Sequence, residues 1–109
     1  MNNLVINIYD KKGKEVVKTA KATTYDLMFG TVQKLMDLLK IEDLNNNLEL
    51  LKVLYEAWTE IRLVLNEVFP EITEEEWKCV KVRELLPVIR DIAKSVIADF
   101  MSIPTDPKN

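Results

Sequence analysis

Histidine is absent from this chain of 109 residues, and cysteine occurs once, at Cys79. A cysteine nucleophile ordinarily needs a histidine base, and a single cysteine cannot form an internal disulfide, which suits a reducing compartment. Glycine occurs only twice, and the sequence contains no phosphate-cradling glycine loop, zinc-ligand spacing or EF-hand loop. We therefore predict no catalytic residues, no metal site and no cofactor, and we expect that the protein is not an enzyme.

Long apolar runs and a strong basic charge are also absent. No segment approaches the roughly 18 apolar residues of a membrane span, and no N-terminal run has the charge and apolar stretch of a signal peptide. The formal net charge is −3, whereas proteins that bind nucleic-acid phosphates generally present a basic surface. These observations predict a cytoplasmic protein that binds neither membranes nor nucleic acid.

The composition favours one folded domain. With 48% hydrophobic and 30% charged residues, the chain can bury a core and is too apolar to remain disordered. We predict an α+β, mainly α fold with a single domain at 1–103, in which a β-hairpin at 4–19 precedes a bundle of three to four helices at 24–102. Residues 104–109 form a polar, proline-containing tail for which no regular structure is expected.

The hairpin is indicated by two β-rich runs, 4–9 and 15–19. Between them, Gly13 can take the positive φ that a tight connection needs. A lone hairpin is marginal in water, so its apolar face must rest on the helices or on another chain. That face comprises Leu4, Ile6 and Ile8.

Charge is unevenly distributed along the sequence. Residues 1–21 hold five lysines against Asp10 and Glu15, a net charge of +3, so the rest of the chain carries −6. Lysines on an edge strand ordinarily stay solvated and discourage aggregation. The basic hairpin could instead pair with the acidic helical body of a second copy, and its contacts would then be Lys11, Lys12 and Lys14.

The first helix is expected to run from a cap at Thr23–Thr24 to about Lys40. Gly30 in its interior indicates close packing or a bend, because glycine costs about 1 kcal/mol relative to alanine in a helix. Residues at helical spacing should form the core face, and two leucines point elsewhere. The core face is Met28, Val32, Leu35, Met36 and Leu39, and the two other leucines are Leu27 and Leu38.

A single second helix is predicted from Leu48 to Phe69, where Pro70 ends it. Its polar residues fall within about 100° of its circumference, so it is apolar around far more surface than an ordinary amphipathic helix needs. The excess predicts either a central helix covered on several sides or a helix partly covered by another subunit.

Two further helices complete the prediction. Thr73 and Glu76 form a capping box that opens a short helix, and the last helix runs from near Arg83 to Ser102, with Pro87 close to its start. The expected core face of this last helix is Leu85, Val88, Ile89, Ile92, Ala93, Val96 and Phe100. Beside it lies a second stripe, Leu86, Ile97 and Met101, which is either the flank of the core or a partner site.

Residues 74–89, EEEWKCVKVRELLPVI, together with the strand pair and the helical body, resemble tail assembly chaperones of long-tailed (siphovirus-type) phages and prophages. The resemblance implies a protein of the host bacterial cytoplasm that coats and solubilises the tape measure protein and promotes tail tube assembly around it. Such chaperones act in multiple copies and are absent from the mature virion. In that family a ribosomal frameshift often appends a second domain that recruits the tail tube protein.

A chaperone of a long helical client needs a shallow, adaptable apolar patch, because many copies each contribute little, and helix-in-groove binding would suit it. Helical geometry offers Leu86, Ile97 and Met101 as client contacts, with Leu27 and Leu38 as alternatives. The competing hypothesis is a small helical adaptor or regulatory protein that binds one folded partner. A chaperone of this kind should form concentration-dependent oligomers, whereas an adaptor should keep a fixed stoichiometry.

Overall fold

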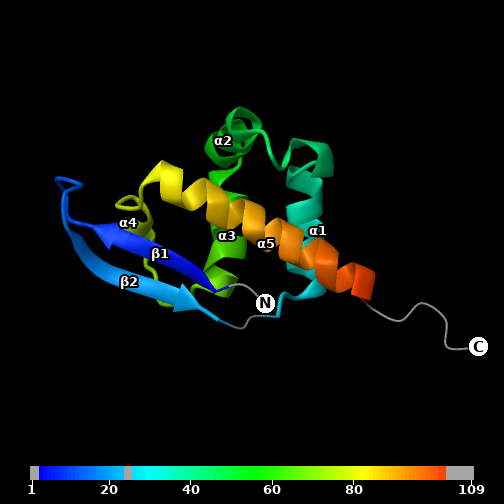
Figure 1. The fold of residues 1–109 in the computed structure, drawn as a ribbon, viewed down its shortest axis with the longest axis horizontal. Coiled ribbons are helices and arrows are strands. Elements are labelled where there is room, and N and C mark those ends of the chain that lie inside the picture. The colour runs from blue at the N-terminus through cyan, green and yellow to red at the C-terminus, as the bar shows by residue number, and fades with distance from the viewer. Residues whose placement is uncertain (1–2, 24–25, 103–109) are drawn as a thin grey trace, which may run out of the picture.

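The longest helix runs diagonally across the molecule, with the N-terminal hairpin below it and a shorter helix above it (Figure 1). This computed structural model describes residues 3–23 and 26–102, except for the side chains of Phe100 and Ser102. In chain order the elements are β1 (Leu4–Tyr9), β2 (Val16–Ala22), α1 (Phe29–Leu38), the 3₁₀ helix η1 (Ile41–Asp43), α2 (Asn47–Glu56), α3 (Trp58–Val68), α4 (Glu74–Trp77) and α5 (Val82–Ser102). This hairpin followed by helices confirms the predicted α+β, mainly α fold class. The predicted tail at 104–109 and the cap residue Thr24 lie outside the described residues.

β1 and β2 pair antiparallel as a two-stranded sheet. Alternate side chains of β1 are buried, and Gly13 in the connection has a φ of 72°, so both predictions for the hairpin are confirmed. The second strand reaches Ala22 and not residue 19, because Ala20 and Ala22 continue the pairing with β1 and are buried. Alanine has little β-propensity, so the sequence pattern gave no sign of this extension.

Asp10 closes the connection between the strands. Its backbone N–H donates to the Glu15 carbonyl at 2.8 Å, and its carbonyl accepts from the Gly13 N–H at 2.9 Å. Its carboxylate accepts from the Lys14 backbone N–H at 2.9 Å. Backbone donors, that of Lys14 foremost, lower the pKa of the Asp10 carboxyl from its ordinary value. The side chains of this connection that were predicted to meet a second copy, Lys11, Lys12 and Lys14, are exposed.

β1 is joined to the start of α5 by polar contacts. The Tyr9 backbone N–H donates to the Cys79 carbonyl at 2.9 Å, and the Asn7 amide donates to Glu84 at 3.2 Å. The Tyr9 hydroxyl donates to the same carboxylate. This hydrogen bond is the largest of the causes that raise the pKa of Tyr9. The Lys81 ammonium lies 4.2 Å from the centre of the Tyr9 ring. This edge of the sheet is therefore fastened to the helical body.

The core lies between the hairpin, α3 and α5. From α5 it takes most of the predicted face, while Val96 packs half-buried against it. The buried members of that face are Leu85, Val88, Ile89, Ile92 and Ala93. From α3 it takes Ile61, Val64, Leu65 and Val68. Three aromatic rings pack together beside it: Trp77 meets both Trp58 and Phe69 edge-on, with ring centroids 6.2 and 6.3 Å away.

The predicted single helix from Leu48 to Phe69 is wrong, because α2 and α3 meet at Ala57, whose φ and ψ are −125° and 37°. No proline or glycine marks this break. α2 packs against α5, whereas α3 packs against α1, so contacts with distant segments set the change of direction. The break also divides the surplus apolar surface. Most of the apolar side chains of α3 are covered within the chain, although Leu63 is 47% exposed, and part of the apolar surface of α2 faces solvent.

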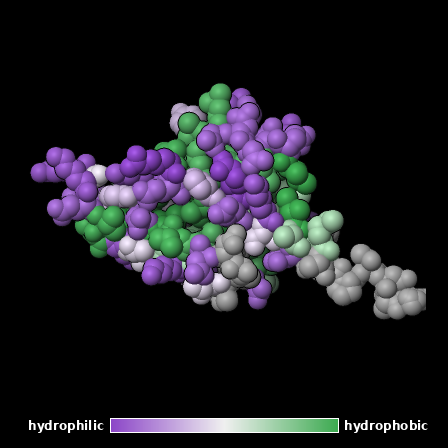
Figure 2. All heavy atoms as spheres, in the orientation of Figure 1, coloured by the Kyte–Doolittle hydropathy of each residue, from purple (hydrophilic) through white to green (hydrophobic). Residues whose placement is uncertain are grey.

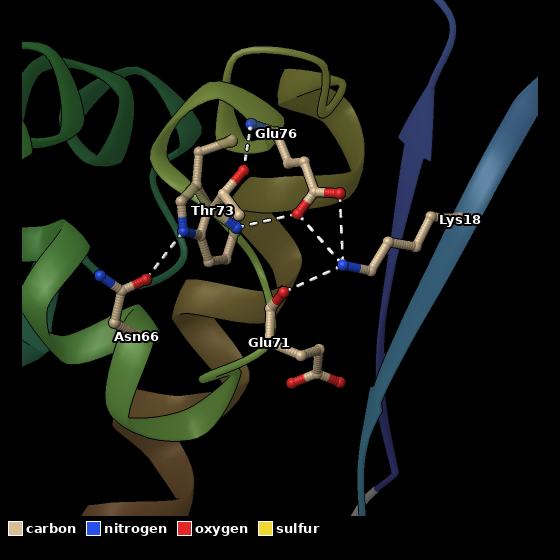
Figure 3. A network of polar contacts seen from close by, with 6 residues as sticks. Lys18, Asn66, Glu71, Thr73 and Glu76 are labelled. Carbon is tan, nitrogen blue, oxygen red and sulfur yellow. Dashed lines mark hydrogen bonds and ion pairs between the residues drawn. The ribbon is translucent and has the colours of Figure 1, made fainter.

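The capping box at the start of α4 is confirmed and also holds the hairpin in place (Figure 3). The Thr73 hydroxyl accepts from the Glu76 N–H at 3.2 Å, and the Thr73 N–H donates to the Glu76 carboxylate at 2.9 Å. Lys18 of β2 reaches the same carboxylate at 3.1 Å and the Glu71 carbonyl at 2.9 Å. Glu76 thus joins a helix cap to the outer strand of the hairpin.

The stability of this joint should depend on pH. Backbone hydrogen bonding with Thr73, and then the Lys18 ammonium, lower the pKa of Glu76 from its ordinary value. A carboxyl with a lowered pKa in the folded state stabilises the fold above its unfolded pKa, and this contribution disappears as the pH falls through the folded pKa. Urea unfolding of the wild type should therefore show a loss of stability below about pH 5, and Glu76→Gln should reduce that loss. The exposed Glu74→Gln variant should keep the wild-type profile; equal profiles for all three proteins would contradict this role of Glu76.

Candidate functional site

α1 begins at Phe29 and not at the threonines predicted as its cap. Its N-terminus is held by Glu67 of α3, whose carboxylate accepts from the Met28 backbone N–H at 2.7 Å and from the Thr31 hydroxyl. A carboxylate at a helix N-terminus satisfies backbone donors and complements the helix dipole. The capping group comes from a distant segment, so a search for a local cap residue could not find it.

The orientation of α1 differs from the prediction. Leu35 and Leu39 are buried as expected, but Met28 and Met36 are exposed. The two leucines predicted to point elsewhere, Leu27 and Leu38, are half-buried against the core instead. α1 packs on α3, and this contact turns the stripe containing Leu35, Leu38 and Leu39 inward.

Close packing, one of the two explanations predicted for Gly30, is not found. Gly30 is exposed, and apart from its chain neighbours and the backbone of its own helix, no described heavy atom lies within 4 Å of the position that a Cβ would take. Close packing therefore does not require glycine at this position, which lies in the first turn of α1.

The main candidate site is an open apolar groove between α1 and the C-terminal half of α5, with a volume of about 450 Å³. From α1 and η1 it takes Phe29, Val32, Gln33, Met36, Asp37 and Ile41, and from α5 it takes Val96, Ile97 and Met101. Two of these side chains stand largely in solvent, since Phe29 is 72% exposed and Met101 is 79% exposed. In Figure 2, hydrophobic side chains reach the surface along the edge where Figure 1 places α1.

Only two of the five predicted client contacts line this groove, namely Ile97 and Met101. Leu86 is 7% exposed and belongs to the core, so this structure does not present it on the surface to a client. Farther along α5, Ile97 packs half-buried against the core and Met101 is exposed. Leu27 and Leu38 pack against the core and do not line the groove.

Sequence reasoning missed the α1 side of the groove. Met36 was predicted to be buried, and Phe29 and Ile41 were not singled out. A signal was present, because Phe29, Val32, Gln33 and Met36 follow helical spacing. Periodicity, however, shows only that residues share a face and not which face meets the core.

A second exposed apolar feature lies on α2, where Leu48, Leu51 and Tyr55 occupy one face; we call these three residues the α2 stripe. Leu48 is 65% exposed and Tyr55 is 85% exposed. Figure 2 shows hydrophobic side chains at the top of the molecule, where Figure 1 places α2. The stripe and the groove have no residue in common.

Within the described residues, no helix is long and apolar enough to cross a membrane. In the same part of the chain, no three His, Cys, Asp or Glu side chains are grouped so that they could hold a metal ion. Comparison with protein-family models, curated proteins and solved structures finds no match for the chain. The function must therefore be inferred from the sequence pattern and the exposed apolar surfaces.

Proposed function

We propose that this protein is a tail assembly chaperone of a long-tailed phage or prophage. It binds the tape measure protein in the host bacterial cytoplasm, keeps it soluble and promotes assembly of the tail tube, in multiple copies that do not remain in the mature virion. Recruitment of the tail tube protein would require a frameshifted extension, as in the family that residues 74–89 resemble. The observation that supports the proposal best is the exposed groove between α1 and α5.

The lining of the groove suits a helical client. Met36 and Met101 have flexible, polarizable side chains that adapt to different apolar surfaces, and Phe29 offers a broad ring at one end. An amphipathic client helix would place its apolar face between α1 and α5. Because the groove is open, each copy contributes modest affinity, and many copies along one long client would act together.

Co-expression with the tape measure protein of the same phage tests the proposal. The double variant Met36→Asp/Met101→Asp should lower the soluble fraction of the client by about tenfold, because desolvating a carboxylate opposes apolar binding. Both side chains are exposed, so circular dichroism should show a folded protein. The matched control is Val17→Asp, an exposed site on the hairpin, which should keep the wild-type soluble fraction.

Two outcomes would contradict the proposal. A tape measure protein that is equally soluble with the wild type and the double variant would remove the groove from client binding. A complex with one folded partner at fixed stoichiometry, with no effect on the tape measure protein, would favour the adaptor hypothesis instead.

A further inference from the structure

One edge of the hairpin has no partner. β2 pairs with β1 along one side, and within the described residues no other backbone hydrogen bond joins β2 to another segment. Figure 1 shows β2 at the rim of the molecule, on the side of β1 away from α5. Unpaired N–H and C=O groups along the edge of a strand are a template for a further strand.

The contacts of β1 show which backbone groups of the hairpin point outward. The Tyr9 N–H donates to the Cys79 carbonyl, so it points away from β2. Backbone groups alternate in direction along a strand, so those of Ile8 point toward β2. Ile8 lies opposite Lys18 in the register, and the backbone groups of Lys18 therefore point toward β1.

Two residues of β2 then direct their N–H and C=O groups away from β1, namely Thr19 and Lys21; we call these two residues the β2 edge. Both side chains are exposed. The register shift opposite Ile8 and Tyr9 leaves Val17 as the extra residue of β2. Because a bulge interrupts regular pairing, the regular edge lies on the Thr19 side of Val17.

The β2 edge is held in place by the rest of the fold. The Lys18 ammonium binds the Glu76 carboxylate at 3.1 Å and the Glu71 carbonyl at 2.9 Å, which ties β2 to the segment around α4 (Figure 3). β1 is fastened in turn to the start of α5 through Asn7 and Glu84. A strand that is already ordered adds little to the entropic cost of binding a peptide.

Positive charge surrounds this edge. Lys21 is exposed on the edge itself, and Lys11, Lys12 and Lys14 are exposed in the connection between the strands. Glu15 is the exposed acid in the same connection. Opposite charges on neighbouring strands stabilise their pairing, whereas like charges directly opposite each other weaken it. The hairpin therefore favours an added strand that carries acidic residues.

A second copy of the chain offers no such strand among its described residues. Its two strands are β1, which has no charged residue, and β2, whose charged residues are two lysines. An acidic helix does not fit either, because the backbone groups of a helix are used within the helix. The complementary occupant is thus an extended acidic segment of a different protein.

We propose that the β2 edge binds an extended acidic segment of another protein, which adds to the hairpin as a third strand. Backbone hydrogen bonds to Thr19 and Lys21 would supply the binding, and an acidic side chain beside Lys21 would supply selectivity. This site shares no residue with the groove between α1 and α5. The inference goes beyond the proposed function and does not depend on it.

Amide hydrogen exchange of the full chain, measured by NMR at neutral pH, tests the added strand. The probe is the capped peptide VEVEVEV, which can place glutamates on the exposed face and valines on the other face. Saturating peptide should slow exchange of the Thr19 and Lys21 amides by at least about tenfold, because both become hydrogen-bonded. The Ala20 amide, which points toward β1, should change little. The peptide VKVKVKV should give no protection.

A pair of variants at one position tests the backbone contact. Thr19→Pro lacks the outward N–H and should abolish protection of Lys21 by VEVEVEV. The hairpin should remain folded, because proline is tolerated where the N–H of an edge strand faces solvent. Thr19→Val is the matched control, since it keeps the N–H and, like the proline variant, removes the hydroxyl that donates to Asn7 at 3.0 Å. It should bind the peptide like the wild type.

Lys21→Glu tests the charge. It replaces an attraction by a repulsion, so the affinity for VEVEVEV should decrease about tenfold. The double variant Met36→Asp/Met101→Asp, which alters the groove, should bind the peptide like the wild type. Loss of peptide binding in that double variant would place the peptide in the groove and overturn the proposal.

Three other results would also overturn it. The first is wild-type protein whose Thr19 and Lys21 amides stay unprotected at saturating VEVEVEV. The second is a folded Thr19→Pro variant that binds the peptide as tightly as Thr19→Val, since charge attraction alone would then explain binding. The third is binding of the hairpin to phosphatidylglycerol vesicles without any binding of the peptide, which would assign the lysines to an anionic membrane surface. None of these results bears on solubilisation of the tape measure protein.

Discussion

Leu86→Asp should unfold the protein. The Leu86 side chain is 7% exposed and belongs to the core cluster, so the substitution would place a carboxylate among apolar side chains. Burying an unpaired charge is among the few changes that cost more than about 4 kcal/mol. A domain of this kind is stable by only about 5–15 kcal/mol. We expect urea unfolding to show a large loss of stability and circular dichroism to show lost helix.

Met101→Asp is the matched control, because it introduces the same charge on the same helix at a side chain that is 79% exposed. Its free energy of unfolding should stay within about 0.5 kcal/mol of the wild type. A folded Leu86→Asp protein with wild-type stability would contradict the core position of Leu86. The comparison also shows why a loss of client binding in a Leu86 variant would say nothing about a binding surface.

Leu86, Ile97 and Met101 show what helical periodicity can and cannot determine. They follow one stripe of α5, yet Leu86 is buried, Ile97 is half-buried and Met101 is exposed. The stripe passes from the core to the groove because α5 extends past the segments that cover its N-terminal half (Figure 1). Helical periodicity in the sequence predicts which residues share one face of α5. How far along the helix that face stays buried depends on the other elements that pack against it.

The same distinction applies to α1 and to the break at Ala57. Strand pairing, the turn at Gly13 and the capping box at Thr73 were predictable, because each depends on residues close together in the chain. The start of α1 depends on Glu67, which is distant in sequence. The change of direction at Ala57 depends on the different neighbours of α2 and α3. Local rules therefore predicted the elements, whereas contacts between distant segments set their limits and formed the groove.

The surplus apolar residues of 48–69 connect the fold to the candidate site. The sequence left open whether they were covered within the chain or by another subunit. In α3, four of these apolar residues are covered within the chain: Ile61, Val64, Leu65 and Val68. The α2 stripe faces solvent. The break at Ala57 therefore separates a part of the segment that is mostly covered within the chain from a part that is exposed.

Phe69→Ala should destabilise the protein by about 3–5 kcal/mol, the usual range for removing a buried phenylalanine. Phe69 follows α3, is 0% exposed and meets the Trp77 ring edge-on. Its removal would leave a cavity and take away an aromatic contact worth about 0.5–1.5 kcal/mol. Trp77 is otherwise held by its indole N–H, which donates to Asn66 at 2.9 Å, so the ring has little freedom to fill the space. Urea unfolding monitored by tryptophan fluorescence measures the loss.

Phe29→Ala is the control of the same residue type, because Phe29 lies on the rim of the groove and is 72% exposed. At concentrations where the protein is monomeric, its unfolding free energy should change by no more than about 0.5 kcal/mol. Client solubilisation should nevertheless decline, since Phe29 offers apolar surface to the bound helix. The two phenylalanines would then separate the residues that hold the fold from those that face a partner. Equal losses of stability in the two variants would contradict that separation.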